Sequence, residues 1–119
     1  MKMNDTERTG RLGEVLAARY LRDRGYEILD ANFRTKLGEL DIVATDGFHL
    51  CIVEVKSRHS GQMFAPAEAV DSGKKYRTEV TGEYFKTISK IELPIRYDVI
   101  EVIFENEREY KINHIRSCW

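Results

Sequence analysis

Hydrophobic and polar positions recur with two different periods along this chain, and each period predicts its own kind of element. From Thr9 to Gly25, apolar and small residues return every three or four positions, which is typical of an amphipathic helix that Thr9 caps. A second helical pattern follows Gly73, and its apolar residues lie four positions apart. This pattern predicts a longer helix in which tyrosines are spaced to face the core. Its apolar residues are Tyr76, Val80, Tyr84 and Ile88.

Period-two patterns and β-branched runs predict the strands between and after these helices. The segments are residues 26–33, 39–44, 48–57, 95–104 and 110–115. Asp46-Gly47 is a strong signal for a hairpin turn, and Pro66 suits the first turn of a short helical segment. The strand over residues 48–57 is apolar on both faces, so we expect it at the centre of the sheet. The order αβββαββ predicts one α/β domain over residues 1–119, a central mixed sheet flanked by helices.

Acidic side chains and one lysine interrupt two of these apolar strands. A two-residue hairpin loop at Asp46-Gly47 would place Glu39, Asp41, Glu54 and Lys56 on one face of the sheet, since side chains alternate with period two. A wider loop that sets Asp41 directly opposite Glu54 keeps this shared face, whereas a slip by a single residue breaks it. The register therefore determines whether these charges meet.

Carboxylates in an apolar strand are costly to desolvate unless a cation compensates them. Asp41 and Glu54 repel and raise one another's pKa unless an ion lies between them, and their oxygens suit Mg²⁺ or Mn²⁺. The alternative is an ordinary internal ion pair, between Glu54 and Lys56 or between Lys56 and Asp41. The residues by themselves leave both interpretations open.

Six short segments give this pattern a wider context. An acid that ends one strand, followed on the next strand by acid, any residue and lysine, resembles the signature of the restriction-endonuclease-like superfamily. In order and spacing, the chain is similar to the YraN-like family of predicted endonucleases, distantly related to archaeal Holliday junction resolvases. The matching segments are Gly10-Arg11-Leu12-Gly13-Glu14, Gly25-Tyr26, Asn32-Phe33-Arg34, Gly38-Glu39-Leu40-Asp41, Val53-Glu54-Val55-Lys56-Ser57-Arg58 and Arg96-Tyr97-Asp98-Val99.

The resemblance implies a restriction-endonuclease-like fold and a metal site. In this interpretation Asp41 and Glu54 hold Mg²⁺ or Mn²⁺, the Val55 carbonyl helps, and Glu14 joins as the acid of the first helix. Glu39 is a further acid at the site or lies just outside it. The ion would polarise a phosphate and lower the pKa of a bound water.

The same resemblance implies catalysis on DNA. Lys56 would orient or deprotonate the attacking water and stabilise the developing charge. We therefore expect a metal-dependent endonuclease that hydrolyses DNA phosphodiester bonds, with branched or junction DNA as a candidate substrate and a homodimer by analogy with the resolvases. The alternatives are a non-catalytic nucleic-acid-binding or scaffold protein that retains the fold, and a hydrolase of smaller phosphate esters.

Composition and charge add bounds. The 119 residues are 42% hydrophobic and carry a net charge of −1, which is lower than most duplex-binding proteins carry. Phosphate contact therefore depends on local basic residues, for which the candidates are Arg34, Arg58, Lys74, Lys75 and Arg77. No stretch is long and apolar enough for a membrane span or a signal peptide, and Cys51 and Cys118 form no disulfide framework. We expect a cytoplasmic protein.

Two further sets of residues are expected to be structural. Asp98 lies in an apolar strand close to Arg96, and we expect it to be paired with that arginine or another basic residue. The histidines show no metal-ligand spacing and are predicted to be structural or on the surface. They are His49, His59 and His114.

Overall fold

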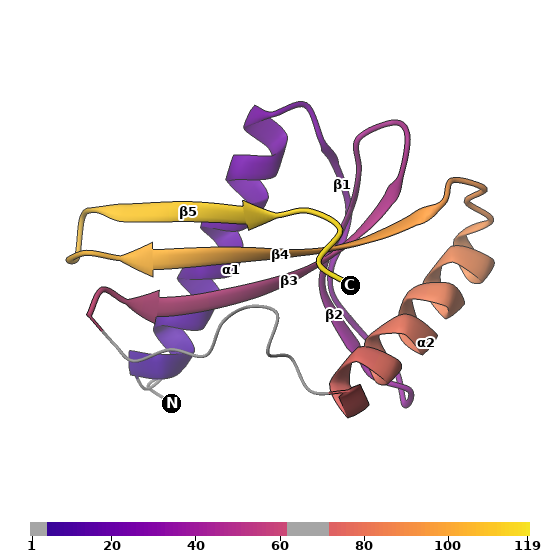
Figure 1. Ribbon diagram of the computed structural model, residues 1–119, viewed down its shortest axis with the longest axis horizontal. Coiled ribbons are helices and arrows are strands. Elements are labelled where there is room, and N and C mark those ends of the chain that lie inside the picture. Colours follow the sequence, from indigo (N-terminus) through magenta and orange to yellow (C-terminus); the bar gives the residue numbers. More distant parts are fainter. Residues whose placement is uncertain (1–4, 62–71) are drawn as a thin grey trace.

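The computed structural model describes residues 5–61 and 72–119, and its element order agrees with the predicted αβββαββ (Figure 1). The short helical segment predicted at Pro66 lies outside the described residues. The elements are α1 (Asp5–Asp23), β1 (Glu27–Arg34), β2 (Glu39–Thr45), β3 (Leu50–His59), α2 (Ser72–Ser89), β4 (Ile95–Phe104) and β5 (Tyr110–Ile115).

The five strands form one mixed sheet in the order β1-β2-β3-β4-β5. Neighbouring strands are antiparallel except β3 and β4, which run parallel over ten residue pairs from Leu50↔Ile95 to His59↔Phe104. Parallel neighbours cannot be joined by a hairpin, and the connection between them carries α2. Figure 1 shows α1 behind strands β3 to β5 and α2 at the right, and the two separate cores place these helices on opposite faces of the sheet. The prediction of a mixed sheet flanked by helices is confirmed.

Each helix packs against one face of the sheet and closes a separate apolar core. Leu16, Ala17 and Leu21 of α1 pack with Val53 and Ile100, and a second core lies on the α2 side. This second core consists of Leu40, Val43, Leu50, Ile52 and Phe85. Every side chain from Leu50 to Val53 is at most 2% exposed. The central position predicted for this strand is therefore confirmed, because a strand covered on both faces has no polar side.

The buried face of α2 differs from the predicted one. Tyr76 and Tyr84 are 69% and 43% exposed, and the helix instead buries Thr78, Thr81, Gly82 and Phe85. The reason is close approach to the sheet: a Cβ added at Gly82 would lie 3.2 Å from the Tyr97 hydroxyl oxygen. Small residues let α2 lie flat on the sheet, whereas tyrosines on that face would hold it away. Tyr20 of α1, in contrast, packs against the first core.

The loop between β2 and β3 is wider than the predicted Asp46-Gly47 turn. Thr45 pairs with Leu50, so four residues form the loop. The Asp46 carboxylate accepts hydrogen bonds from the backbone N–H groups of Phe48 and His49, at 2.8 and 2.7 Å. Gly47 adopts a φ of 92°, which favours glycine. Compared with the predicted two-residue turn, the pairing of β2 with β3 is therefore shifted by two residues. Because two is an even number, each side chain still points to the predicted face of the sheet.

A buried carboxylate links the last two strands. Asp98 has no exposed surface, and Arg96 donates two hydrogen bonds to it at 2.9 and 2.8 Å. His114 Nε2 lies 2.8 Å away, and the Ser117 N–H donates at 3.1 Å. Burial by itself would raise the pKa of Asp98, but these hydrogen bonds hold it below its ordinary value. The predicted structural pairing of Asp98 with Arg96 is confirmed.

Among the described residues, neither helix has the length and apolar character that a bilayer crossing requires. Cys51 is buried and Cys118 is half-buried, and within the described residues neither forms a disulfide bond. Burial raises the pKa of the Cys51 thiol to about 11, so this thiol is protonated at neutral pH.

Replacing the buried carboxylate should destabilise the domain strongly. Asp98→Asn removes the buried anionic partner of Arg96, which keeps its ion pair with Asp46, and we expect a loss of about 3–5 kcal/mol in the free energy of unfolding. The folded pKa of Asp98 lies below 3.8, so its contribution should be complete above about pH 4 and decrease as the pH falls further. Urea denaturation at several pH values measures this, with exposed Asp23→Asn as the control. An equal loss in both variants would contradict the assignment.

Candidate functional site

The predicted acids meet in a cleft between α1 and the neighbouring ends of β2 and β3. Its volume is about 550 Å³. Five of the residues singled out from the sequence line this cleft: Glu14, Asp41, Glu54, Val55 and Arg58. The other lining residues come from the first turns of α1 and the end of β3, and they are Thr6, Thr9, Gly10, Ser57 and His59.

Asp41 lies just beyond the end of the β2·β3 ladder. The last paired residues of this ladder are Ile42 and Val53. Continuing the same register by one residue sets Asp41 opposite Glu54. The Asp41 carboxylate accepts the N–H of Val55 at 2.9 Å, so a side chain bonds to β3 here. Leu40 and Val43 are three positions apart, so in a regular strand their side chains would point to opposite faces of the sheet. They pack in the same core, which shows that the alternation of side chains is interrupted around Asp41.

The electrostatic environment of Asp41 disfavours its charge. Its pKa is raised from 3.8 to about 7, first because the carboxyl is buried and then because Glu54 and Glu14 are negative. The hydrogen bond from Val55 and the charge of Lys74 act in the opposite direction and do not overcome this. The positive charge and hydrogen bonding around Asp41 are thus too weak to offset the cost of ionising its carboxyl group.

Glu54 has a cationic partner, but a different one from the predicted lysine. The ammonium group of Lys74, in the first turn of α2, forms an ion pair and hydrogen bond with Glu54. The Glu54 side chain is 11% exposed and the Lys74 side chain 43%. Burial lowers the pKa of Lys74, yet the bond to Glu54 and the nearby acids raise it overall. From the sequence, Lys74 was predicted to contact phosphate. That prediction rested on the cluster of basic residues at the start of this helix, which gives no indication of a bond to Glu54.

Lys56 is not among the residues that line the cleft. It is half-buried and lies in register with Glu101 of β4, whose carboxylate accepts a hydrogen bond from Asn113 at 2.8 Å. Within the described part of the chain, Lys56 forms no ion pair with Asp41 or Glu54. The structural alternative based on Lys56 is therefore not observed, and a catalytic role for this lysine stays a prediction.

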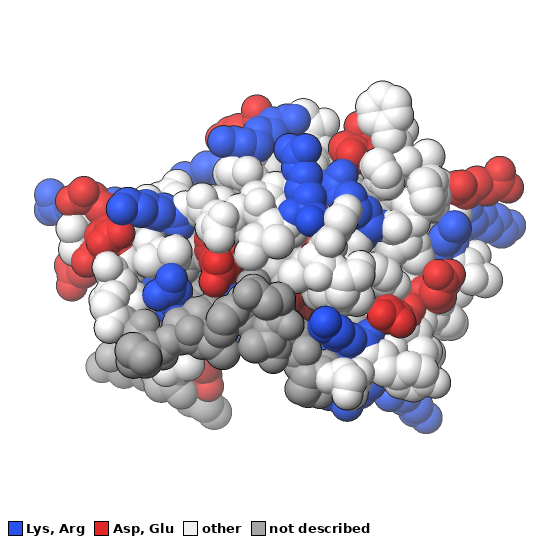
Figure 2. All heavy atoms as spheres, viewed as in Figure 1, with Lys and Arg blue, Asp and Glu red and all other residues white. Residues whose placement is uncertain are grey.

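The other predicted residues lie around the cleft. Glu39 and Arg34 face each other across β1 and β2, 3.5 Å apart, with side chains 68% and 74% exposed. The Lys75 ammonium lies 5.8 Å from the centre of the Trp119 ring, and Arg77 is exposed. Figure 2 shows basic and acidic side chains interspersed over this face. Arg34 and Lys74 each lie beside a carboxylate, so neither adds an uncompensated positive charge to the surface.

The donor set fits a divalent cation in part. Carboxylate oxygens of Asp41 and Glu54 are hard ligands, and a cation between them would relieve the repulsion that raises the Asp41 pKa. Among the described residues, no three acidic, histidine or cysteine side chains gather closely enough for a complete protein shell. The remaining positions would fall to the Val55 carbonyl and to water, and Mg²⁺ commonly retains several waters.

The fold and this cleft define a mixed α/β domain with a half-buried pair of carboxylates. Residues 13–102 match the profile described as "Uncharacterised protein family UPF0102", and the chain belongs to this family. The UPF0102 protein of Alkaliphilus oremlandii is 40% identical over 116 residues, which cover 95% of this chain and 98% of the relative. That of Thermodesulfovibrio yellowstonii is 39% identical over 110 residues, covering 92% and 94%. The YraN-like family resemblance is thereby confirmed.

Removing the charge of Asp41 should change how stability depends on pH. Because the folded pKa is about 7 and the ordinary value 3.8, the folded state retains a proton that the unfolded state loses, and stability falls as pH rises between them. Asp41→Asn should therefore gain several degrees in melting temperature over wild type as pH increases from about 4 to 7. Metal-free thermal melts measure this, with exposed Asp23→Asn as control. A constant difference across the range would refute the raised pKa.

Proposed function

We propose that this chain is a metal-dependent endonuclease that hydrolyses phosphodiester bonds of DNA. The observation that supports this proposal most directly is the pair of Asp41 and Glu54 at the end of the β2·β3 ladder, where burial and mutual repulsion raise the Asp41 pKa to about 7. Strongly perturbed acids in a cleft are characteristic of functional sites. The sequence resemblance to predicted endonucleases adds the reaction class.

In this proposal the chain supplies the ligands for Mg²⁺ or Mn²⁺. Asp41 and Glu54 would hold the ion, the Val55 carbonyl would assist, and Glu14 would act from α1. When bound, such an ion polarises a phosphate and lowers the pKa of a coordinated water. The Val55 N–H holds the Asp41 carboxylate in place, so one ligand is already oriented. Lys74 must release or share Glu54 when the ion binds.

The remaining roles concern the DNA. Arg58 lines the cleft and would contact a phosphate, and Lys56 would act on the attacking water or the developing charge. Lys56 must then reach the phosphate from beside the cleft rather than from its wall. A preference for branched or junction DNA and a homodimer rest on the sequence resemblance alone.

One observation favours the second candidate, a non-catalytic nucleic-acid-binding or scaffold protein. The Lys74 ammonium already neutralises Glu54, as expected of a structural ion pair. The pair is nearly half exposed on the lysine side, and such pairs contribute about 0–1 kcal/mol. The pair leaves Asp41 with a raised pKa, and for this reason we prefer the metal-dependent function.

Metal binding separates the two candidates. Titration calorimetry with Mn²⁺ should show binding that weakens at least tenfold in Asp41→Ala and in Glu54→Ala, because each removes a ligand. Lys74→Gln should tighten binding severalfold, because it frees Glu54 from its present partner. Exposed Glu92→Ala is the matched acidic control. No Mn²⁺ binding in wild type, together with a lower melting temperature in Lys74→Gln, would support the structural candidate.

Cleavage tests the proposed chemistry. Wild type is incubated with linear, flapped, single-stranded and four-way-junction DNA, with Mg²⁺ and separately with Mn²⁺. Lys56→Ala should retain metal and DNA binding and lose about 100-fold or more of the cleavage rate. Exposed Lys36→Ala should cleave as wild type does. If wild type binds DNA and cuts none of these substrates, and Lys56→Ala behaves identically, the non-catalytic candidate is correct.

A further inference from the structure

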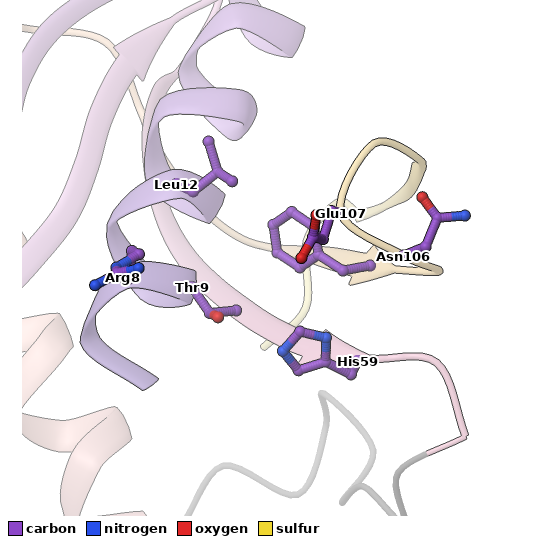
Figure 3. Close-up of a pocket in the computed structure, with 7 residues that line it drawn as sticks. Arg8, Thr9, Leu12, His59, Asn106 and Glu107 are labelled. Atoms are coloured by element: carbon purple, nitrogen blue, oxygen red, sulfur yellow. The ribbon is translucent and has the colours of Figure 1, made fainter. Parts of the chain in front are cut away.

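A second pocket lies directly beside the carboxylate cleft. Its volume is about 520 Å³, and Figure 3 shows it enclosed by α1, the end of β3 and the turn between β4 and β5. Its lining residues are Arg8, Thr9, Leu12, His59, Phe104, Asn106 and Glu107. Thr9 and His59 also line the carboxylate cleft, so the two hollows are neighbours that share a wall.

The pocket has an apolar and aromatic floor. The Phe104 ring lies against the core, and the His59 ring is 6.0 Å from it with the planes inclined at 44°. Leu12 of α1 is 45% exposed, so a large aliphatic side chain faces solvent here. Exposed apolar surface in a concave site is characteristic of ligand binding. Flat aromatic ligands suit such a site because they can stack on the exposed ring of His59.

The rim of the pocket is polar on two sides. Arg8 and Thr9 lie on the α1 side, and the Glu107 carboxylate comes from the β4–β5 turn. Asn106 is already occupied in that turn, where its side chain accepts the N–H groups of Arg108 and Glu109 and donates to the Glu109 carboxylate. Figure 3 shows the Asn106 side chain directed away from the hollow. On the rim, Thr9 thus offers a hydroxyl and Glu107 an acid that accepts hydrogen bonds.

We propose that this pocket binds an unpaired nucleobase of the DNA strand whose phosphate lies at the carboxylate cleft. The proposal rests on the proposed function for the position of the phosphate. A nucleobase combines a flat face that can stack on the His59 ring with N–H and carbonyl edges for Glu107 and Thr9. The shared wall at Thr9 and His59 places base and phosphate in adjacent hollows.

The geometry has a consequence for the class of substrate. A base within a continuous duplex is stacked and paired, so it enters a pocket only if it is unpaired or extruded, which costs its stacking and pairing energy. A strand that is already single at this position avoids that cost. The pocket therefore selects single-stranded or branched DNA over continuous duplex, and it does so through the base rather than through junction symmetry.

The test removes a single base from the DNA and, separately, the aromatic ring of residue 59 from the protein. A short single-stranded oligonucleotide with one abasic residue, moved through each position in turn, is compared with the intact strand by fluorescence anisotropy. Binding is measured in EDTA and again with Ca²⁺. For wild type we expect one position at which loss of the base weakens binding about tenfold, the scale of one stacked base. The His59→Ala variant should bind the intact strand about tenfold more weakly than wild type does. Its affinity should no longer change when the abasic residue is placed at that position.

Two further variants make the result specific. His59→Phe keeps an aromatic ring without the histidine nitrogens and should restore the response to the abasic residue. Phe48→Ala removes a ring that is 75% exposed on the β2–β3 loop, outside this pocket, and should behave as wild type. If no position responds, or if His59→Ala responds as wild type does, the base pocket is wrong.

The outcomes distinguish failure of this proposal from failure of the proposed function. Cleavage by wild type without any response to the abasic residue overturns the base pocket and leaves the nuclease intact. A position-specific response that requires the ring of residue 59, without cleavage under any metal condition, supports the base pocket and overturns the nuclease. Absence of both overturns both.

Discussion

The parallel pairing of β3 with β4 is the constraint on which the rest of this structure depends. Parallel neighbours require a long crossover, and here the crossover carries α2 across one face of the sheet. The first turn of that helix places Lys74 at Glu54. The far ends of the same two strands bring His59 next to Phe104. One pairing thus positions a charge at the carboxylate cleft and forms the floor of the neighbouring pocket.

Two acids in this fold show opposite responses to burial. Asp98 is fully buried, yet Arg96 and the other donors around it lower its pKa, so it remains charged and holds strands together. Asp41 is partly buried among acids, and its pKa is raised to about 7. The difference lies in compensation: donors surround Asp98, whereas Asp41 has one backbone N–H and a lysine shared with Glu54. A fully compensated acid serves structure, whereas an undercompensated one is suited to binding a cation.

The fold leaves the region around Asp41 able to respond to a ligand. Lys74 neutralises one of the cleft acids, and its side chain is 43% exposed, so the pair holds little free energy and can rearrange. Glu14 approaches from α1, on the opposite side of the sheet from α2. Gly13 allows this approach, since a Cβ there would clash with the Ser57 side chain at 1.8 Å. The acids therefore come from three elements, α1, β2 and β3.

The sequence by itself determined the elements and their type, because hydrophobic period reflects local geometry. The two C-terminal strands agree with their predicted bounds, and the proximity of Asp41 to Glu54 followed from a hairpin register with period two. Tertiary structure decided which face of α2 is buried, since this depends on how closely the helix approaches Tyr97. It also decided that Lys74, rather than Lys56, meets Glu54. Contacts across a parallel crossover join residues distant in sequence, and no local pattern encodes them.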